Sequence, residues 1–275
     1  MGDIRSIPGA SLSSGFSEDE DFSRFIVNIK RLTSIDLSQY KENQMRRRLT
    51  TLRMKHGFRS FDEYFAALST EARLRNEFLD RMTINVSEFW RNPNRWQVLR
   101  EKFLTQMLKQ SSRLSIWSAA CSTGEEPYTL AMIMDSLGAL DRSTVLATDI
   151  DDGVLAKARE GVYLERSLRD VPADFKSKYF IPEDGAFRID SRLKKAIKLQ
   201  KQNLLLDTFG SHFDLIVCRN VMIYFTEDAK HILYGKFAQA LKPGGLLFVG
   251  STEQIFSPGQ YGLETADTFF YRRVN

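Results

Sequence analysis

The stretch that decides the fold is residues 117–128, with the sequence WSAACSTGEEPY. It follows an apolar run over residues 114–117 and leads, through small and polar residues, into a helical pattern over residues 126–137. A strand that enters a helix through such a turn is typical of a βαβ unit, whose parallel strands bind ligands at their carboxyl ends. The small residues Ala119, Ala120 and Gly124 would let backbone amides approach a ligand closely there.

The same alternation of strand and helix continues toward the C-terminus. We predict strands over residues 144–148, 213–218 and 246–249, helices over 95–108, 151–160 and 227–241, and a final antiparallel strand over 268–272. Residues 163–201 interrupt this pattern with prolines and an Asp184-Gly185 turn, and we interpret them as an inserted hairpin or three-stranded sheet. The fold class expected is therefore α/β with a mostly parallel sheet.

The N-terminal part has a different pattern, with apolar residues at helical spacing such as Phe22, Phe25 and Ile29. We predict a small all-α domain over residues 16–84, with Ser38 and Ser60 as N-caps and Gly57 as a left-handed helix end. A polar tail over residues 1–15 is expected to be disordered, and residues 85–94 are expected to link the helical domain to a second domain over residues 95–275.

Composition excludes several classes of protein. The 275 residues contain 43% hydrophobic residues but no run of about 18 apolar residues and no secretory leader pattern, so we expect a cytoplasmic location without membrane insertion. The two cysteines and three histidines are scattered without metal-ligand spacing. We therefore expect neither a disulfide framework nor a metal site.

Positive charge is concentrated in the second predicted helix, although the net charge is only +4. On a helical wheel Arg47 lies outermost, Arg46 and Arg53 lie on one flank, and Arg48 and Lys55 lie on the other. Such a face is suited to an acidic partner. A nucleic acid or simple solvation would also explain a basic face, although no RNA-stacking motif or base-reading element accompanies it.

Carboxylates follow the first two predicted strands of the sheet. Glu125 and Glu126 would repel a pyrophosphate, and no GxGxxG motif is present, which counts against a dinucleotide ligand. The two carboxylates could instead favour a cationic ligand such as a sulfonium. Alternatively, they only interact favourably with the dipole at the N-terminus of the helix. Asp149 ends the second strand, where a carboxylate can accept hydrogen bonds from both ribose hydroxyls or can merely cap the next helix. Its position one βαβ unit after the first loop favours the ribose.

Further segments extend this pattern: a helix stop and tight turn over residues 241–245 (LKPGG), NVSEFWR over 85–91, NLL over 203–205 and CRNVMIYF over 218–225. With residues 117–128 and 149–151, they make the chain resemble class I, Rossmann-like S-adenosylmethionine-dependent methyltransferases. More specifically, it resembles the chemoreceptor glutamate methyltransferases, or CheR family, from about residue 22 to residue 271.

The resemblance implies S-adenosylmethionine as cofactor and S-adenosylhomocysteine as product. The implied cofactor-binding residues are Asn85, Ser87, Arg91, Ala120, Glu126, Asp149, Asn203, Leu204, Arg219 and Asn220. Arg91 and Tyr224 are the implied catalytic residues, Arg91 holding the substrate carboxylate and Tyr224 donating a hydrogen bond near it. Where the family often has Thr, this chain has Ser87, and the hydroxyl is retained. Without the resemblance, a plain interdomain hinge would explain the linker equally well, and Tyr224 could be an aromatic packing residue.

The implied activity is methyl-ester formation on specific glutamates of chemoreceptors, for chemotactic adaptation. The basic face of the second helix, with Arg46, Arg47, Arg48, Arg53 and Lys55, would bind the receptor's cytoplasmic methylation helices rather than nucleic acid. Residues 180–186 (FIPEDGA) are short and lack the glycine-rich extension associated with binding a receptor C-terminal pentapeptide, so we expect recognition independent of that tether, by a monomer. The alternatives are a methyltransferase acting on RNA or a small metabolite, and a non-catalytic, cofactor-sensing receptor adaptor.

Overall fold

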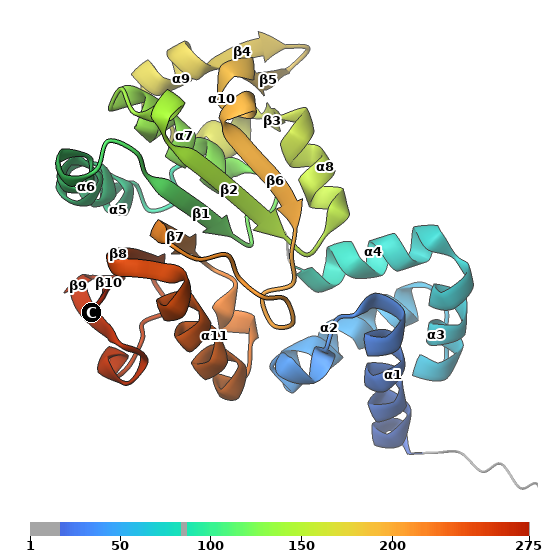
Figure 1. Ribbon diagram of the computed structural model, residues 1–275. Coiled ribbons are helices and arrows are strands. Elements are labelled where there is room, and N and C mark those ends of the chain that lie inside the picture. Colours follow the sequence, from blue (N-terminus) through green and yellow to red (C-terminus); the bar gives the residue numbers. More distant parts are fainter. Residues whose placement is uncertain (1–16, 84–86, 275) are drawn as a thin grey trace, which may run out of the picture.

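The computed structural model describes residues 17–83 and 87–274, which form a helical domain and a larger α/β domain (Figure 1). The predicted tail over residues 1–15 and the predicted cofactor residue Asn85 lie outside the described residues. Among the described helices, none combines the length and the apolar character needed to cross a bilayer.

Within residues 17–83, four helices pack their apolar faces together. They are α1 (Glu18–Thr33), α2 (Glu42–Lys55), α3 (Phe61–Thr70) and α4 (Ala72–Thr83). A capping box starts α1, because the Ser17 hydroxyl accepts from the Glu20 N–H while the Glu20 carboxylate accepts from the Ser17 N–H. The centre of this domain is aromatic, with Phe25 in contact with Phe61 and Tyr64.

The predicted ends of these helices are confirmed at Gly57, whose φ is 79°, and at Ser60, which accepts from the Glu63 N–H. The predicted N-cap at Ser38 is wrong. Ser38 lies in a 3-10 turn, where its N–H and its hydroxyl both bond to the Asp36 carboxylate, and α2 begins only at Glu42.

In the described part of the chain, seven strands form a mixed sheet in the order β6-β2-β1-β7-β8-β10-β9. The strands are β1 (Ser115–Ala119), β2 (Thr144–Asp149), β6 (Ile197–Lys201), β7 (Phe213–Cys218), β8 (Leu241–Val249), β9 (Leu263–Asp267) and β10 (Phe270–Arg273). The pairs β6-β2, β2-β1, β1-β7 and β7-β8 are parallel, whereas β10 runs antiparallel to β8 and β9. The strand order changes direction between β1 and β7, which is the position where such sheets bind ligands.

Helices cover both faces of this sheet. They are α5 (Pro93–Val98), α6 (Thr105–Gln110), α7 (Glu125–Ser136), α8 (Asp152–Glu160) and α11 (Glu227–Ala240). The apolar residues of α5 to α8 belong to one core cluster, with Trp96 against Phe248, and those of α11 belong to another, with Phe237 against Trp117. The sheet is therefore the middle of three layers, which confirms the α/β prediction.

The insert is a second, antiparallel sheet of the described chain, in the order β3-β5-β4. It is built from β3 (Val162–Leu164), β4 (Phe180–Glu183) and β5 (Ala186–Ile189), with α9 (Ala173–Tyr179) and α10 (Ser191–Ala196) beside it. The predicted C-terminal limit of the insert, residue 201, is too late. Residues 197–201 form β6, an edge strand of the main sheet paired with β2.

Other elements also differ from prediction: α9 and α10 were not expected, and β8 starts at Leu241 rather than at residue 246. The helix expected over residues 95–108 runs from Pro93 to Gln110 and contains a π-helical segment, Leu99–Leu104. Strand β9 was not predicted, because its sequence, LETAD, lacks a clear apolar run.

Candidate active site

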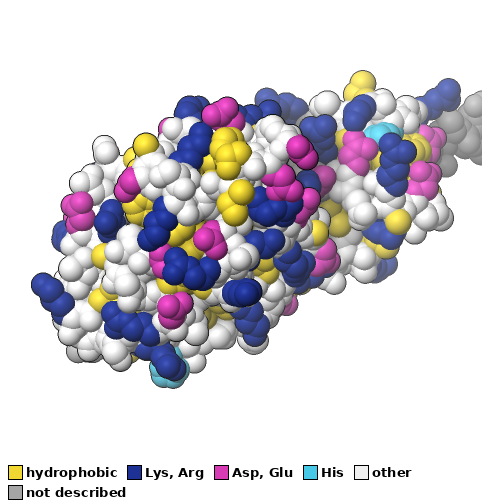
Figure 2. Space-filling model, turned by 90° about the horizontal axis from the view of Figure 1, so that it is seen from above, with side chains coloured by type: hydrophobic (Ala, Val, Ile, Leu, Met, Phe, Trp, Pro, Cys, Tyr) yellow, Lys and Arg dark blue, Asp and Glu magenta, His cyan; other side chains and the backbone are white. Residues whose placement is uncertain are grey.

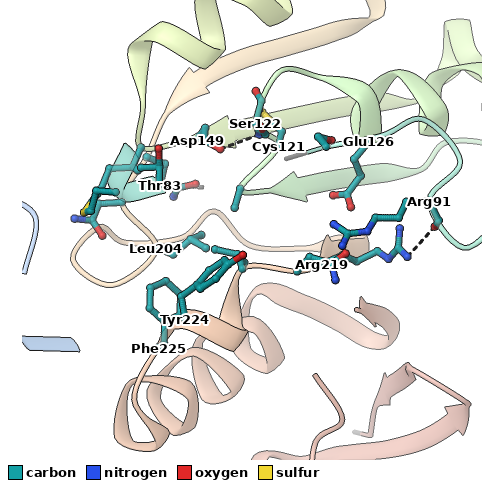
Figure 3. Close-up of a pocket in the computed structure, with 18 of the residues that line it drawn as sticks. Thr83, Arg91, Cys121, Ser122, Glu126, Asp149, Leu204, Arg219, Tyr224 and Phe225 are labelled. Carbon is teal, nitrogen blue, oxygen red and sulfur yellow. Dashed lines mark hydrogen bonds between the residues drawn. The ribbon is translucent and has the colours of Figure 1, made fainter. Parts of the chain in front are cut away.

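Residues that follow β1, β2 and β7 surround one pocket at the carboxyl edge of the sheet, with about 1000 Å³ of empty space when its opening to solvent is included. The pocket also receives side chains from the linker and from the helical domain, so both domains build its wall (Figure 3). The sheet alone explains why the first three loops meet, because their strands are parallel neighbours.

The loop after β1 approaches the pocket with an unusual backbone. Ala120, Ser122 and Gly124 all have positive φ, at 60°, 49° and 98°. A Cβ on Gly124 would meet Ala158 and the Tyr163 hydroxyl at 3.0 Å, so a side chain there would be both strained and crowded. The sequence therefore keeps this turn tight and close to any ligand bound above it.

Asp149 ends β2 and points into the pocket. One of its carboxylate oxygens accepts from the Ser122 N–H at 2.8 Å, and the other accepts from the Asp151 N–H at 3.1 Å (Figure 3 draws the Ser122 contact). Each oxygen retains a lone pair for a further donor, which suits the two hydroxyls of a ribose. Burial raises the pKa of Asp149 to about 6, while backbone N–H donors, above all those of Asp151 and Ser122, oppose the shift.

Glu126 enters the pocket from the first turn of α7. The Ser118 hydroxyl donates to its carboxylate at 2.8 Å. Figure 3 shows the Glu126 carboxylate and the Arg91 side chain directed toward one another across the pocket. Burial raises the pKa of Glu126 to about 7, although Arg219 and Arg91 favour the ionised form. A cationic ligand placed beside this carboxylate would remove most of that penalty.

Arg219 connects β7 to the linker. Its guanidinium donates to the Arg91 carbonyl at 2.9 Å and to the Asn92 side chain at 2.7 Å. The same group stacks over Phe248, with its central carbon 4.7 Å from the ring centroid. The Ser87 hydroxyl hydrogen-bonds to the buried Glu125 carboxylate. Within the described part of the linker, Ser87, Arg91 and Asn92 are thus hydrogen-bonded to the α/β domain.

The loops around residues 203 and 224 also form part of the pocket wall and connect it to the helical domain. Asn203 uses its side chain to accept from the Leu205 N–H and to donate to the Ser34 carbonyl, so it ties the loop to the helical domain as well as lining the pocket. The Tyr224 carbonyl accepts from the Lys41 N–H at 2.9 Å. Tyr224 therefore lies where the two domains join.

The structure brings together every expected cofactor or catalytic residue that it describes. The pocket is lined by Ser87, Arg91, Ala120, Glu126, Asp149, Asn203, Leu204, Arg219, Asn220 and Tyr224. Sharing a wall does not test the role given to each residue, and those roles stay predictions.

Sequence reasoning missed the part of the wall that the helical domain supplies, namely Tyr40, Met82 and Thr83. The Tyr40 ring packs edge-on against Phe225, with centroids 5.0 Å apart. No local pattern marks these residues, because only the docking of the two domains places them at the pocket. Ile150 and Gln202, also in the wall, are neighbours of predicted residues and could have been included for that reason.

The predicted basic face of α2 is only partly exposed. Arg53 is buried, with its guanidinium 4.6 Å from the Phe61 centroid and 3.9 Å from the Asp21 carboxylate, so the prediction that it faces a partner is wrong. Arg46 pairs with Asp19 of α1 at 2.6 Å. The acidic first turn of α1 therefore occupies this flank of the helix.

The other flank of α2 lines a groove shared with α4, which we call the basic groove. Its lining residues are Gln44, Arg47, Arg48, Thr51, Leu52, Lys55 and Arg81. Arg48 leads from this groove to the pocket, because it donates to the Met82 carbonyl at 3.1 Å and lies 5.9 Å from the Tyr224 ring centroid. Arg81, which was not predicted, adds a positive charge to the groove, whereas Lys55 pairs with Glu77 of α4 at 2.7 Å.

Other functional chemistries find little support in the described ranges. There, no three His, Cys, Asp or Glu side chains gather as a set of metal ligands. Cys121 lines the pocket, but burial raises the pKa of its thiol well above the usual value, which leaves it a poor nucleophile.

The doubly wound sheet, with Glu126 and Asp149 lining a pocket at its carboxyl edge and no GxGxxG motif after β1, fits the class I S-adenosylmethionine-dependent methyltransferases. A family model described as "CheR methyltransferase, SAM binding domain" matches residues 85–270, and one described as "CheR methyltransferase, all-alpha domain" matches residues 20–83. The chain belongs to the CheR methyltransferase family. Both the resemblance and the predicted cofactor, S-adenosylmethionine, are thereby confirmed.

Several known proteins are similar in sequence to this chain along most of its length. A "Chemotaxis protein methyltransferase" of Listeria monocytogenes is 41% identical over 92% of this chain and 97% of that protein. Proteins of the same name from Borreliella burgdorferi and Escherichia coli are 36% and 34% identical, over 89% and 86% of this chain and 91% and 85% of theirs.

Proposed function

We propose that this enzyme transfers the methyl group of S-adenosylmethionine to the side-chain carboxylate of specific glutamates in chemoreceptors, forming methyl esters for chemotactic adaptation. The relatives named chemotaxis protein methyltransferase support this substrate class. The basic groove is the structural observation that supports the proposal, because an acidic helix bound along it would reach the cofactor pocket beside Arg48.

The groove suits an acidic helix that must reach the cofactor pocket. Arg47, Arg48, Lys55 and Arg81 line it, and Arg48 touches the pocket wall at Met82 and Tyr224. A receptor helix lying between α2 and α4 would thus present one glutamate toward the reacting methyl group while its other carboxylates meet the arginines. We propose Arg47, Arg48 and Arg81 as the receptor-binding residues. Lys55 pairs with Glu77 of α4 at 2.7 Å, as Arg46 pairs with Asp19, and Arg53 is buried, so these three are not included.

The chemistry needs alignment rather than a strong base, because a glutamate side chain is already ionised near neutral pH. When bound, S-adenosylmethionine supplies the methyl group of its sulfonium, and the leaving group is the neutral thioether of S-adenosylhomocysteine, so no proton transfer is needed. Arg91 and Tyr224 are proposed to hold the attacking carboxylate oxygen in line with that methyl group, at a separation of about 3–3.5 Å. Exclusion of water by the docked receptor helps, since opposite charges cancel in the transition state.

Cofactor binding is proposed to divide among the pocket residues by chemistry. Asp149 would accept from the ribose hydroxyls, and Glu126 would face the cationic amino-acid end of the cofactor. The lone pairs left on Asp149 and the unfavourable burial of ionised Glu126 support this division.

The insert is proposed to work without a receptor pentapeptide tether. Strand β4 is an edge strand whose Pro182 has no N–H, so it offers fewer donors to an added peptide strand. Basic side chains on the face seen from above are mixed with acidic ones (Figure 2), and in the insert Arg188 pairs with Glu183 at 2.6 Å. We further propose that the enzyme acts as a monomer, in the cytoplasm.

A labelled-methyl assay tests the proposal against its rivals. The enzyme is mixed with methyl-labelled S-adenosylmethionine and a receptor cytoplasmic fragment, total RNA or a metabolite extract. Base-labile label on the receptor fragment supports ester formation on glutamate. Label only on RNA or metabolites would support the first rival, and receptor binding without turnover would support a non-catalytic adaptor.

A further inference from the structure

Glu253 is a buried carboxylate that the proposed chemistry does not use. It follows β8, and only 4% of the residue is exposed. One carboxylate oxygen accepts from the N–H groups of Asn220 and Gly250, at 2.7 and 2.8 Å. The other accepts from the N–H groups of Met222 and Ile223, at 2.7 and 3.3 Å. The side chain thus collects four main-chain donors.

Three of these donors belong to the loop that carries the site. Residues 219–224 leave β7 at the pocket, and both Asn220 and Tyr224 line it. Asn220 has a φ of 63°, a left-handed conformation that side chains other than Gly adopt infrequently. A loop with this backbone persists when surrounding contacts over-determine it, and Glu253 supplies those contacts from another strand.

The chain is also shaped to accommodate this carboxylate. A Cβ on Gly250 would lie 2.5 Å from a Glu253 carboxylate oxygen and 2.9 Å from the Asn220 nitrogen. A residue larger than glycine would displace the carboxylate, the loop or both. Burial raises the pKa of Glu253, while the N–H donors of Asn220, Gly250 and Met222 favour its charged form.

An ionised carboxylate can accept hydrogen bonds from all four main-chain N–H groups, whereas an amide cannot. Both of its oxygens are acceptors, so all four N–H groups are satisfied at once. A glutamine of the same shape would turn its NH2 group toward two of the four donors, leaving them unpaired in a buried place.

We propose that Glu253 is a positioning residue for methyl transfer, whose carboxylate fixes the loop over residues 220–224 and thereby orients Asn220 and Tyr224 at the pocket. This rests on the roles given to Asn220 and Tyr224 in the proposed function. Glu253 itself does not line the pocket among the described residues, so it acts through the loop. The expected effect therefore falls on turnover and cofactor binding rather than on receptor recognition.

Glu253→Gln is the direct test, with the purified full chain and a receptor fragment. We expect kcat to fall on the order of 10–100-fold, the dissociation constant of S-adenosylhomocysteine to rise several-fold, and the KM for the receptor to stay within about twofold. Asp214→Asn is the matched control. Asp214 is also a shielded carboxylate that accepts a main-chain N–H, from Ser115 at 2.7 Å, although it pairs in addition with Lys242 at 2.8 Å, and it lies at the opposite end of β7. It should lose thermal stability without losing kcat.

A double-mutant cycle separates this inference from the roles on which it rests. If Glu253 acts through Tyr224, the Glu253→Gln, Tyr224→Phe double variant should lose less kcat than the product of the two single losses. Multiplicative losses, or a Glu253→Gln variant that behaves like Asp214→Asn, would overturn the inference. A Tyr224→Phe variant with unchanged kcat would instead overturn the role of Tyr224. Should Glu253→Gln not fold, Gly250→Ala strains the same anchor, and wild-type kcat in that variant contradicts the inference.

Discussion

Cofactor binding is predicted to weaken as pH falls through neutrality, because Glu126 must be ionised to face a cation. Burial raises the pKa of Glu126 to about 7 in the free protein. Below that pH the carboxyl is mostly protonated, so binding of the cofactor's ammonium group must first expel a proton. The affinity for the cofactor is therefore highest above the pKa of Glu126 and decreases as the pH falls below it.

The size of the effect follows from the two pocket carboxylates. With a pKa of about 7, the ionised fraction of Glu126 falls from about 0.76 at pH 7.5 to about 0.09 at pH 6, a factor of roughly eight. Asp149, with a pKa of about 6, contributes a further factor of about two over the same range. The wild-type dissociation constant should therefore rise on the order of 15-fold.

Isothermal titration with S-adenosylhomocysteine at pH 6 and pH 7.5 measures this change. Glu126→Gln removes the titrating group while keeping its shape, so it should bind more weakly at pH 7.5 and show only the roughly twofold dependence that Asp149 leaves. Equal pH dependence in the wild type and in Glu126→Gln would refute the assignment of Glu126 to the cationic end of the cofactor.

Three further variants test the remaining parts of the site. Asp149→Ala should weaken S-adenosylhomocysteine binding roughly 100-fold in titration calorimetry, since it removes two hydrogen bonds to a charged acceptor, and unchanged affinity would remove the ribose assignment. The double substitution Arg47→Ala, Arg48→Ala should leave the affinity for S-adenosylhomocysteine intact but lower kcat/KM for a receptor fragment by about tenfold or more. The control Arg46→Ala should change kcat/KM little, because Arg46 pairs with α1. Equal losses of kcat/KM in the double variant and in the control would contradict receptor binding in the groove. Tyr40→Ala should weaken cofactor binding several-fold by opening the wall from the helical domain, and wild-type affinity would show that this wall is not used.

The sequence predicted the elements whose signal is local. Strands β1, β2 and β7 were found because each is a short apolar run that ends in a polar loop, and Asp149 was found because it terminates such a run. Residues 197–201 were assigned to the insert because a short run that alternates between apolar and polar residues is common both to a hairpin and to the edge of a larger sheet. Pairing with β2 decides between them, and pairing is not encoded within the run itself.

What the sequence did not predict depends on contacts between distant segments. Tyr40 reaches the pocket only because the helical domain docks through the Tyr40–Phe225 bridge. Arg53 was expected to face solvent because a helical wheel shows which residues share a face but not which neighbour covers it, and α1 covers this one. Glu253 lies 33 positions from Asn220, so its role as an anchor is visible only in three dimensions.

A crystal structure of the full chain with S-adenosylhomocysteine is the most direct test of where the cofactor binds. We predict both ribose hydroxyls within about 2.5–3.0 Å of the Asp149 carboxylate oxygens, with the ammonium group beside Glu126. The ligand found elsewhere on the chain, or in this pocket with its ribose turned away from Asp149, would contradict it.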